Sequence, residues 1–348
     1  MPKAKQPAMP LLTYEADVPT GLETLAAAEI EALPQIYSVQ KGVGAVRFQR
    51  PEIRLNNVQQ LKLVTAVYLT QVYPVPRPKA LLGHQHFQGL LKQIEVAMLH
   101  EPGAFRTFHL AAAGDDSSVM QRIKSEISAS TGLMADDEGG DLWIRMRRDA
   151  QKTGWEILVR TSRRPLVTRP WRVRDWPGAV NAVLAHAAVR QTRPSPEDVF
   201  LNIGSGSGTI LIERGMSGPS RMLIGVENND EVISIAQENA LSVPYVRLNW
   251  LHGDGQKLPI PSQSVDALAA DLPFGVLIGS TESNEELYPA LLNEAARVAK
   301  PGARFAIITQ SVRVMDSLLP SQRLWQVEDM LKVTQGGLHP RLYTLVRR

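Results

Sequence analysis

The chain has 348 residues, of which 44% are hydrophobic and 21% charged, and its formal net charge is +3. This length allows about two domains with buried cores. Because no stretch approaches the ~20 apolar residues of a membrane span and the opening residues lack the apolar core of a signal peptide, we expect a cytoplasmic protein. The absence of cysteine excludes disulfides, thiolate metal sites and the thiol nucleophile that pyrimidine C5 methylation requires.

The first half of the chain predicts an α+β unit that ends near residue 165. Thr20 and Glu23 form a capping box ahead of an apolar helix that should stop before Pro34. The other predicted elements are a strand over 14–18, a hairpin over 36–50, helices over 57–73 and 86–99, a strand over 105–110, a helix capped at Ser118, and strands over 142–148 and 155–161.

A proline-rich connector follows over residues 166–190, and it contains an apolar helix at 179–190. Between Arg145 and Arg174, ten basic residues stand against two acidic ones. Such clustering is expected of a surface that binds a polyanion, and a solvated basic face is an equal alternative. Trp171 and Trp176 could stack on bases or fix the connector to the next domain, and we favour the second interpretation.

From residue 191 onwards, strands and helices alternate regularly. Strands are predicted over 199–203, 222–226, 245–251, 265–270 and 303–309, helices over 208–215, 230–240 and 284–299, and two edge strands over 323–332 and 341–347. Strands separated by helices imply a parallel sheet with helices on both faces. The predicted fold class is therefore α/β.

A glycine-rich turn, with Gly204, Gly206 and Gly208, joins the first of these strands to its helix. Glycines let the backbone pass close to a ligand and let the next helix start at once. Glu227 ends the following strand, where a carboxylate can accept both ribose hydroxyls of a nucleoside cofactor. Both features fit NAD as well as S-adenosylmethionine, and a glycine turn can also be purely structural.

The residues further along distinguish the two cofactors. Asp254 follows the third strand and would accept a hydrogen bond from an adenine amino group, although a lone Asp in a loop is more often a turn residue. The segment Asp271-Leu272-Pro273-Phe274 is suited to hold an exocyclic amine. Proline fixes the backbone so that the Asp271 carboxylate and the Leu272 carbonyl can each accept a hydrogen bond from that amine. Phe274 would stack on the ring that carries the amine. Holding both protons points the nitrogen lone pair at a methyl group, so positioning supplies much of the rate.

With these motifs, the chain resembles the THUMP-domain RNA methyltransferases with a Rossmann-type catalytic domain, in particular those that form N2-methylguanosine in the tRNA acceptor stem. The glycine turn and the segment from Asp271 match closely, and residues 105–162 are similar to a THUMP module. The resemblance implies three parts: an α+β, THUMP-containing RNA-binding region at 1–165, the connector and lead-in helix at 166–190, and at 191–348 a class I Rossmann-like methyltransferase domain with a mostly parallel seven-stranded sheet.

The resemblance also implies direct methyl transfer from S-adenosylmethionine to guanine, with Asp271, Leu272, Pro273 and Phe274 as catalytic residues. The implied cofactor-binding residues are Asn202, Gly204, Gly206, Gly208, Thr209, Glu227, Asn228, Asp254 and Gly255. The arginines expected to contact phosphates of RNA, in particular tRNA, are Arg163, Arg164, Arg169, Arg172 and Arg174. No metal is expected, because His84 and His86 lack cysteine or clustered carboxylates beside them.

Asn202 departs from the family, which usually has an acidic residue there, and Ile203 and Ser205 stand where proline and cysteine are common. An amide can hydrogen-bond the methionine end of the cofactor but cannot pair with its ammonium group. Three alternatives therefore stay open: a catalytically weak or silent RNA-binding relative, an rRNA guanine-N2 methyltransferase, and an NAD-type oxidoreductase. The sequence sets neither the target nucleotide nor the oligomeric state.

Overall fold

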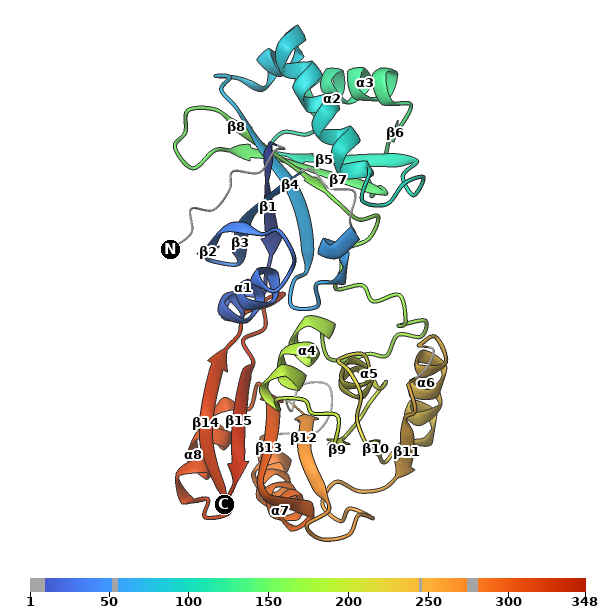
Figure 1. Ribbon diagram of the computed structural model, residues 1–348, viewed down its shortest axis with the longest axis vertical. Coiled ribbons are helices and arrows are strands. Elements are labelled where there is room, and N and C mark those ends of the chain that lie inside the picture. The colour runs from blue at the N-terminus through green and yellow to red at the C-terminus, as the bar shows by residue number, and fades with distance from the viewer. Residues whose placement is uncertain (1–9, 52–55, 244–245, 274–280) are drawn as a thin grey trace. The chain divides into compact units, whose positions relative to one another are not determined.

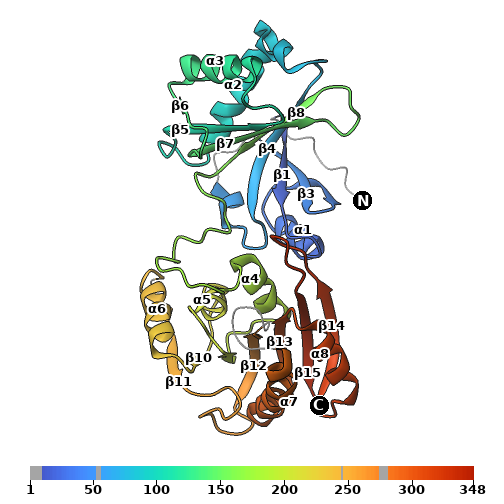
Figure 2. The same ribbon diagram turned by 180° about the vertical axis from the view of Figure 1, so that it is seen from behind.

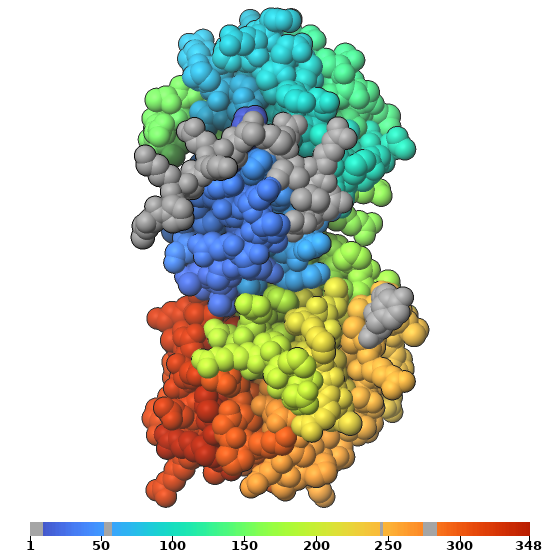
Figure 3. Space-filling model, viewed as in Figure 1, coloured from blue at the N-terminus to red at the C-terminus, as the bar shows by residue number. Residues whose placement is uncertain are grey.

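The structure is a computed structural model that describes residues 10–51, 56–243, 246–273 and 281–348. The chain divides into two compact units, the first formed by Met1–Val18 and Glu23–Val167 and the second by Pro19–Leu22 and Thr168–Arg348. Figures 1 and 3 colour the first unit blue to green and the second mainly lime to red. From Thr168 onwards the connector, with its helix, is thus part of the second unit. No helix among the described residues is long and apolar enough to cross a membrane.

The first unit is built on an eight-stranded, mostly antiparallel sheet. Its strands are β1 (Leu11–Asp17), β2 (Tyr37–Gly42), β3 (Ala45–Pro51), β4 (Ala66–Tyr73), β5 (Thr107–Ala112), β6 (Met134–Ala135), β7 (Leu142–Arg148) and β8 (Trp155–Arg160). Their order in the sheet is β2-β3-β1-β4-β8-β7-β5-β6. The helices are α1 (Glu23–Glu31), α2 (His84–Met98) and α3 (Ser118–Thr131), with short 3-10 turns η1 (Asn56–Gln60) and η2 (Pro78–Leu82).

The helix predicted over 57–73 is wrong, because η1 is followed there by strand β4. β4 lies between β1 and β8, and its first five residues are all buried. A strand buried on both faces loses the alternation of apolar and polar residues, so its apolar run cannot be told from a helix by periodicity. The N-cap of α3 is also one residue earlier than predicted, since the Ser117 side chain accepts a hydrogen bond from the Met120 amide.

The second unit contains the predicted seven-stranded, mostly parallel sheet. Its strands are β9 (Val199–Ile203), β10 (Met222–Glu227), β11 (Asn249–His252), β12 (Val265–Asp271), β13 (Ala299–Thr309), β14 (Trp325–Lys332) and β15 (Arg341–Arg347). Their order is β11-β10-β9-β12-β13-β15-β14, and β15 runs antiparallel to both of its neighbours. The helices are α4 (Ala182–Gln191), α5 (Thr209–Gly215), α6 (Asp230–Leu241), α7 (Thr281–Val298) and α8 (Val312–Leu318), followed by the 3-10 turn η3 (Leu319–Ser321).

Helices α4, α5 and α6 cover one face of this sheet, and α7 and α8 cover the other (Figures 1 and 2). The core under α7 contains Leu201, Ile203, Leu268 and Leu292, all at most 1% exposed. β9 has β10, the next strand in the chain, on one side and β12 on the other. Ligands of such sheets bind outside the carboxyl ends of the strands where the order reverses, so this topology places a site at the ends of β9, β10 and β12.

Candidate active site

The predicted site segments meet at the carboxyl edge of the second unit's sheet. The parallel register sets Asn202 opposite Gly225 on β10 and Ala269 on β12. Glu227 lies two residues beyond Gly225, and Asp271 lies two residues beyond Ala269. Both carboxylates therefore stand at the ends of strands that flank β9, from which the glycine turn leaves.

The three glycines of the turn adopt backbone conformations that favour glycine. The φ angles of Gly204, Gly206 and Gly208 are 60°, 53° and 87°. At Gly204 and Gly206 an added Cβ would have no atom within 4 Å, whereas at Gly208 it would come within 2.8 Å of the Trp250 ring. The same ring would be 2.8 Å from a Cβ at Gly225. Trp250, which the sequence did not single out, thus supports the turn from β11 and requires both glycines.

Glu227 is bound to the turn through its carboxylate. Its Oε2 accepts a hydrogen bond from the Gly206 amide at 2.9 Å, and its Oε1 accepts one from the Asn228 amide at 3.0 Å. The Asn228 carbonyl is 3.0 Å from Nε2 of His252. Each carboxylate oxygen can accept more than one hydrogen bond, so Glu227 keeps acceptor sites for the two hydroxyls of a ribose.

Asp254 forms a turn, as the more ordinary interpretation of a lone Asp in a loop predicted. It is exposed, and its Oδ1 accepts a hydrogen bond from the Gln256 amide at 2.9 Å. Gly255 packs closely beneath it, because an added Cβ would lie 2.9 Å from Cγ2 of Ile203. The turn leaves Oδ2 of Asp254 available, so a turn role and a contact with an adenine amino group are compatible.

Two side chains that were predicted to contact the cofactor, those of Asn202 and Thr209, form hydrogen bonds within the protein. Asn202 is fully buried, and its Nδ2 donates to the Ala269 carbonyl at 3.1 Å, while its Oδ1 has no hydrogen-bond partner in the part of the chain that the structure describes. Thr209 is also buried, and its Oγ1 accepts a hydrogen bond from Nη2 of Arg172 at 2.9 Å. Contact of either side chain with a cofactor stays a prediction, and the orphaned Oδ1 of Asn202 is the atom with capacity for one.

Among the carboxylates at this edge of the sheet, Asp271 has the pKa that burial shifts most. Its Oδ1 is buried and has no hydrogen-bond partner among the described residues, and burial raises the pKa of Asp271 to about 8. The Leu272 amide donates to the Ile308 carbonyl at 2.9 Å, which fixes the segment to β13. Phe274 lies outside the described residues. An unpartnered carboxylate oxygen at the end of β12 is suited to accept a hydrogen bond from a substrate amine.

Two residues that sequence reasoning missed hold this segment in place. The Pro273 carbonyl accepts hydrogen bonds from Tyr288 Oη at 2.8 Å and from Asn284 Nδ2 at 2.9 Å. The Tyr288 hydroxyl also lies 2.7 Å from Thr309 Oγ1, and Asn284 Nδ2 donates to Ser311 Oγ at 2.9 Å. Asn284 and Tyr288 are fully buried and lie four residues apart on α7. A polar pair at this spacing is the only sequence signal that could have indicated them.

The structure contradicts the prediction that Arg169 contacts a phosphate. Arg169 is 3% exposed, and its Nε donates to Glu213 Oε1 at 2.7 Å. The other carboxylate oxygen of Glu213 lies 3.0 Å from Nδ1 of His186. Trp171 is equally buried, so it fixes the connector within the second unit, as we favoured, and does not offer a face for stacking.

Three other arginines that were expected to contact RNA, Arg163, Arg164 and Arg174, are all exposed. The Nε of Arg163 lies 2.6 Å from Asp141, while Arg174 lies 2.9 Å from Glu238. Ion pairs between exposed groups contribute little to stability and exchange readily with solvent, so contact of these three residues with RNA stays a prediction.

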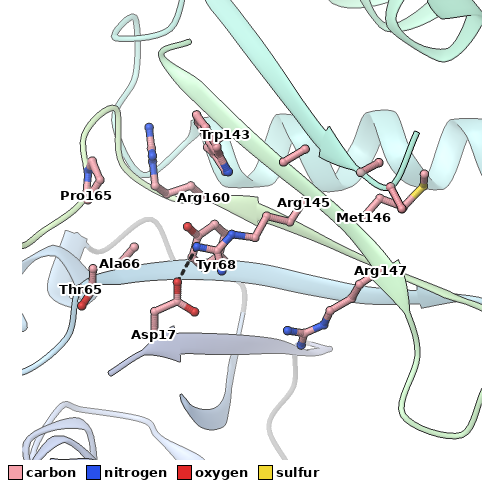
Figure 4. A pocket seen from close by; sticks show the side chains of 13 residues that line it. Asp17, Thr65, Ala66, Tyr68, Trp143, Arg145, Met146, Arg147, Arg160 and Pro165 are labelled. Carbon is pink, nitrogen blue, oxygen red and sulfur yellow. Dashed lines mark hydrogen bonds and ion pairs between the residues drawn. The ribbon is translucent and has the colours of Figure 1, made fainter. Parts of the chain in front are cut away.

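The first unit has a cavity of about 610 Å³ lined by basic and aromatic side chains (Figure 4). Arg145 lies over the Tyr68 ring, 4.2 Å from its centroid, and forms an ion pair with Asp17 at 2.6 Å. Trp143 and Arg160 line the same cavity. Among the residues that the structure describes, no group of three or more His, Asp or Glu side chains is placed to hold a metal ion.

The carboxyl edge of the sheet fits a nucleoside cofactor. The open space beside Gly204 and Gly206, the remaining acceptor sites of Glu227 and the unpartnered Oδ1 of Asn202 together supply a close backbone approach and polar groups. The strand order, the glycine turn after β9 and the acidic end of β10 are those of a class I methyltransferase, a class that uses S-adenosylmethionine.

The comparison with known families agrees with this class. Residues 169–341 match the family described as "RMKL-like, methyltransferase domain". This part of the chain is similar to that methyltransferase family, which supports the expected domain type.

Relatives with assigned functions bear out the resemblance to tRNA guanine-N2 methyltransferases. The chain is 26% identical to the tRNA (guanine(6)-N2)-methyltransferase of Thermus thermophilus over 95% of its own length and 98% of that protein. It is 30% identical to the tRNA (guanine(6)-N(2))-methyltransferase THUMP3 of Bos taurus over 49% of its own length, and this match spans only 37% of the bovine protein.

Solved structures show the same fold over nearly the whole chain. TrmN from Thermus thermophilus superimposes with a TM-score of 0.75 at 23% identity, covering 97% of this chain and 100% of that one. A second neighbour, solved in complex with SAH, has a TM-score of 0.71 at 15% identity and covers 96% of this chain and 97% of its own.

Proposed function

We propose that the chain is an S-adenosylmethionine-dependent tRNA methyltransferase that forms N2-methylguanosine at guanosine 6 of the acceptor stem. The observation that carries the proposal is the buried Oδ1 of Asp271, at the end of the strand beside the glycine turn, for which the described residues supply no hydrogen-bond partner. The substrate is supported by the names of the relatives, of which the Thermus protein is matched over 98% of its length. Action in the cytoplasm remains part of the proposal.

In this proposal Asp271 and the Leu272 carbonyl hold the exocyclic amine of guanine. Oδ1 of Asp271 accepts one amine proton as a hydrogen bond, and the hydrogen bonds of Tyr288 and Asn284 to the Pro273 carbonyl fix the backbone around it. S-adenosylmethionine, when bound, supplies an electrophilic methyl group. The nitrogen becomes acidic once methylated, and a carboxylate whose pKa burial raises to about 8 is suited to take that proton.

The cofactor would be held by the groups at the ends of β9, β10 and β11. Glu227 would accept hydrogen bonds from the ribose hydroxyls, and Asp254 would accept one from the adenine amino group. Gly204 and Gly206 would allow the backbone to approach the cofactor closely. These residues bind and orient. Because the amine needs no strong base before transfer, positioning is their main contribution to the rate.

We propose that the first unit binds the RNA. Its cavity is lined by Arg145, which lies over the Tyr68 ring, and by Trp143 and Arg160. Cationic and aromatic side chains in one cavity suit an unpaired nucleotide. The exposed Arg163 and Arg164 follow β8 in the chain and would add phosphate contacts. The target guanine must leave its stack, because an exocyclic amine inside a helix cannot enter a protein site.

Nucleoside analysis tests the proposed substrate. The protein is incubated with S-adenosylmethionine and, in separate reactions, with unmodified tRNA and rRNA, and the nucleosides are identified by mass spectrometry. We expect N2-methylguanosine in tRNA alone. Methylation of rRNA alone would support the rRNA alternative, and cofactor binding without methylation of either RNA would support a silent relative.

A further inference from the structure

The connector contacts both helices that flank the glycine turn. Arg169 pairs with Glu213 on α5 at 2.7 Å, and Arg172 donates to Thr209, the first residue of α5, at 2.9 Å. The Arg174 amide donates to Oδ1 of Asn239 on α6 at 2.8 Å. A segment predicted to bind phosphates is therefore engaged with the elements that carry the cofactor site.

Asn239 links the connector directly to the turn. It is fully buried, and its Nδ2 donates to the Arg174 carbonyl at 3.0 Å and to the Ser207 carbonyl at 3.1 Å. Ser207 lies between Gly206 and Gly208 in the turn. The Asn239 side-chain amide thus hydrogen-bonds both backbone groups of Arg174 and one carbonyl of the turn. Because this amide is buried in the protein, it makes these bonds from the side of the turn that faces the protein interior.

The turn needs such support because of its composition. Gly204, Gly206 and Gly208 lie at positive φ, and glycine explores more backbone conformations than any other residue. Ordering a flexible turn at the moment of binding lowers affinity, whereas a turn already held in its bound conformation avoids that cost.

We infer that the connector preorganises the cofactor-binding turn, with Asn239 and Arg172 as positioning residues for S-adenosylmethionine. The inference rests on the cofactor of the proposed function and not on its RNA substrate. Arg172 contributes by holding Thr209 through one Nη2 that also donates to the Val180 carbonyl at 2.9 Å. The connector thereby acts on cofactor affinity.

Isothermal titration calorimetry with S-adenosylhomocysteine, in the absence of RNA, tests this inference. It measures the Kd of the 348-residue protein and of its variants. Asn239→Ala leaves the Ser207 carbonyl and the Arg174 amide unpaired, and we expect the Kd to rise about tenfold. Arg172→Leu keeps an apolar side chain at this position but removes the hydrogen-bond donors, and a rise in Kd of at least about threefold is expected. Arg174→Ala is the matched control, because it removes only the exposed pair with Glu238 and keeps the backbone bonds to Asn239; its Kd should match the wild type.

Thermal unfolding of the same variants separates positioning from a merely structural role. If Asn239→Ala and Arg172→Leu unfold at lower temperature but bind S-adenosylhomocysteine with the wild-type Kd, the inference is wrong. Should Asn239→Ala not fold, the Kd of Arg172→Leu alone decides. Wild-type protein that binds the cofactor but methylates no tRNA would reject the proposed substrate and leave this inference standing.

Discussion

Asp271 is the residue whose chemistry the fold changes most. Its Oδ1 is buried with no hydrogen-bond partner from residues 10–51, 56–243, 246–273 or 281–348, and burial raises the pKa from 3.8 to about 8. In the free protein the carboxyl is therefore largely protonated at neutral pH. The ionised carboxylate is the stronger hydrogen-bond acceptor for the substrate amine, and only this form can take up the proton that the methylated nitrogen releases. Protonation of Asp271 therefore opposes the reaction.

This protonation predicts a pH dependence of activity. Between about pH 6 and 8, kcat/KM for tRNA should rise with pH, approaching tenfold per unit well below the pKa, and level off above about 8, because kcat/KM reports the ionisation of the free enzyme. Asp271→Asn cannot ionise, so its low residual activity should be independent of pH over this range. The measurement is initial rate at limiting tRNA and constant ionic strength. A flat wild-type profile would contradict the assigned role.

Tyr288 should affect catalysis and not cofactor binding. Tyr288→Phe removes the 2.8 Å hydrogen bond to the Pro273 carbonyl, so the segment from Asp271 loses part of its support. We expect kcat to fall about tenfold, which corresponds to the loss of about 1.4 kcal/mol of positioning, with an unchanged Kd for S-adenosylhomocysteine. Tyr343→Phe is the control, since that hydroxyl bonds Asp316 at 2.8 Å. Equal losses of kcat in both variants would show that the effect is not specific to the site.

Among the elements of the second unit, most could be predicted from the sequence and the supporting contacts could not. The strands β9, β10 and β12 are short apolar runs bounded by glycine, proline and acidic residues, which local patterns identify well. In the first unit, β4 was missed because burial on both faces removes its alternation. Trp250 and Asn239 act through contacts with residues distant in the chain, and no local pattern carries that information.

The connector shows the same limit in its charges. Its arginines form a basic cluster in the sequence, yet Arg169 is enclosed in an ion pair with Glu213 because α5 lies beside the connector in space. Composition gives the number of charges along a segment. It cannot say which of them face water, because that depends on partners supplied by other elements.

The buried pair predicts a large loss of stability when one partner is removed. In Arg169→Ala, the carboxylate of Glu213 keeps His186, at 3.0 Å, but loses its permanently charged partner. Breaking a buried pair costs about 3–5 kcal/mol, so differential scanning calorimetry should show a Tm about 10 °C lower for the second unit. Arg174→Ala, which loses an exposed pair, should change Tm by at most about 2 °C. Replacing both partners, as in Arg169→Met with Glu213→Leu, should restore much of the stability; no recovery would argue against the uncompensated charge as the cause.

For the whole molecule, the exposure of the arginines predicts how RNA binding depends on salt. Replacing the exposed Arg163, Arg164 and Arg174 with alanine should weaken tRNA binding and reduce the slope of log K against log salt by up to about 0.9 for each phosphate that is no longer neutralised. Fluorescence titrations between low and high salt measure this slope. A destabilised but folded Arg169→Ala protein should keep the wild-type slope. An unchanged slope in the triple variant would place the RNA-binding surface elsewhere.

The transfer of a methyl group to the guanine amine held by Asp271 is tested most directly by a single-turnover assay on a tRNA transcript with guanosine at position 6. Wild-type protein in excess should convert that guanosine to N2-methylguanosine, located by mass spectrometry of ribonuclease fragments. Asp271→Ala should lower the rate of transfer at least about 10³-fold while binding S-adenosylhomocysteine and tRNA with nearly wild-type affinity. Transfer by Asp271→Ala at close to the wild-type rate, or a methyl group on any atom other than N2, would contradict this assignment.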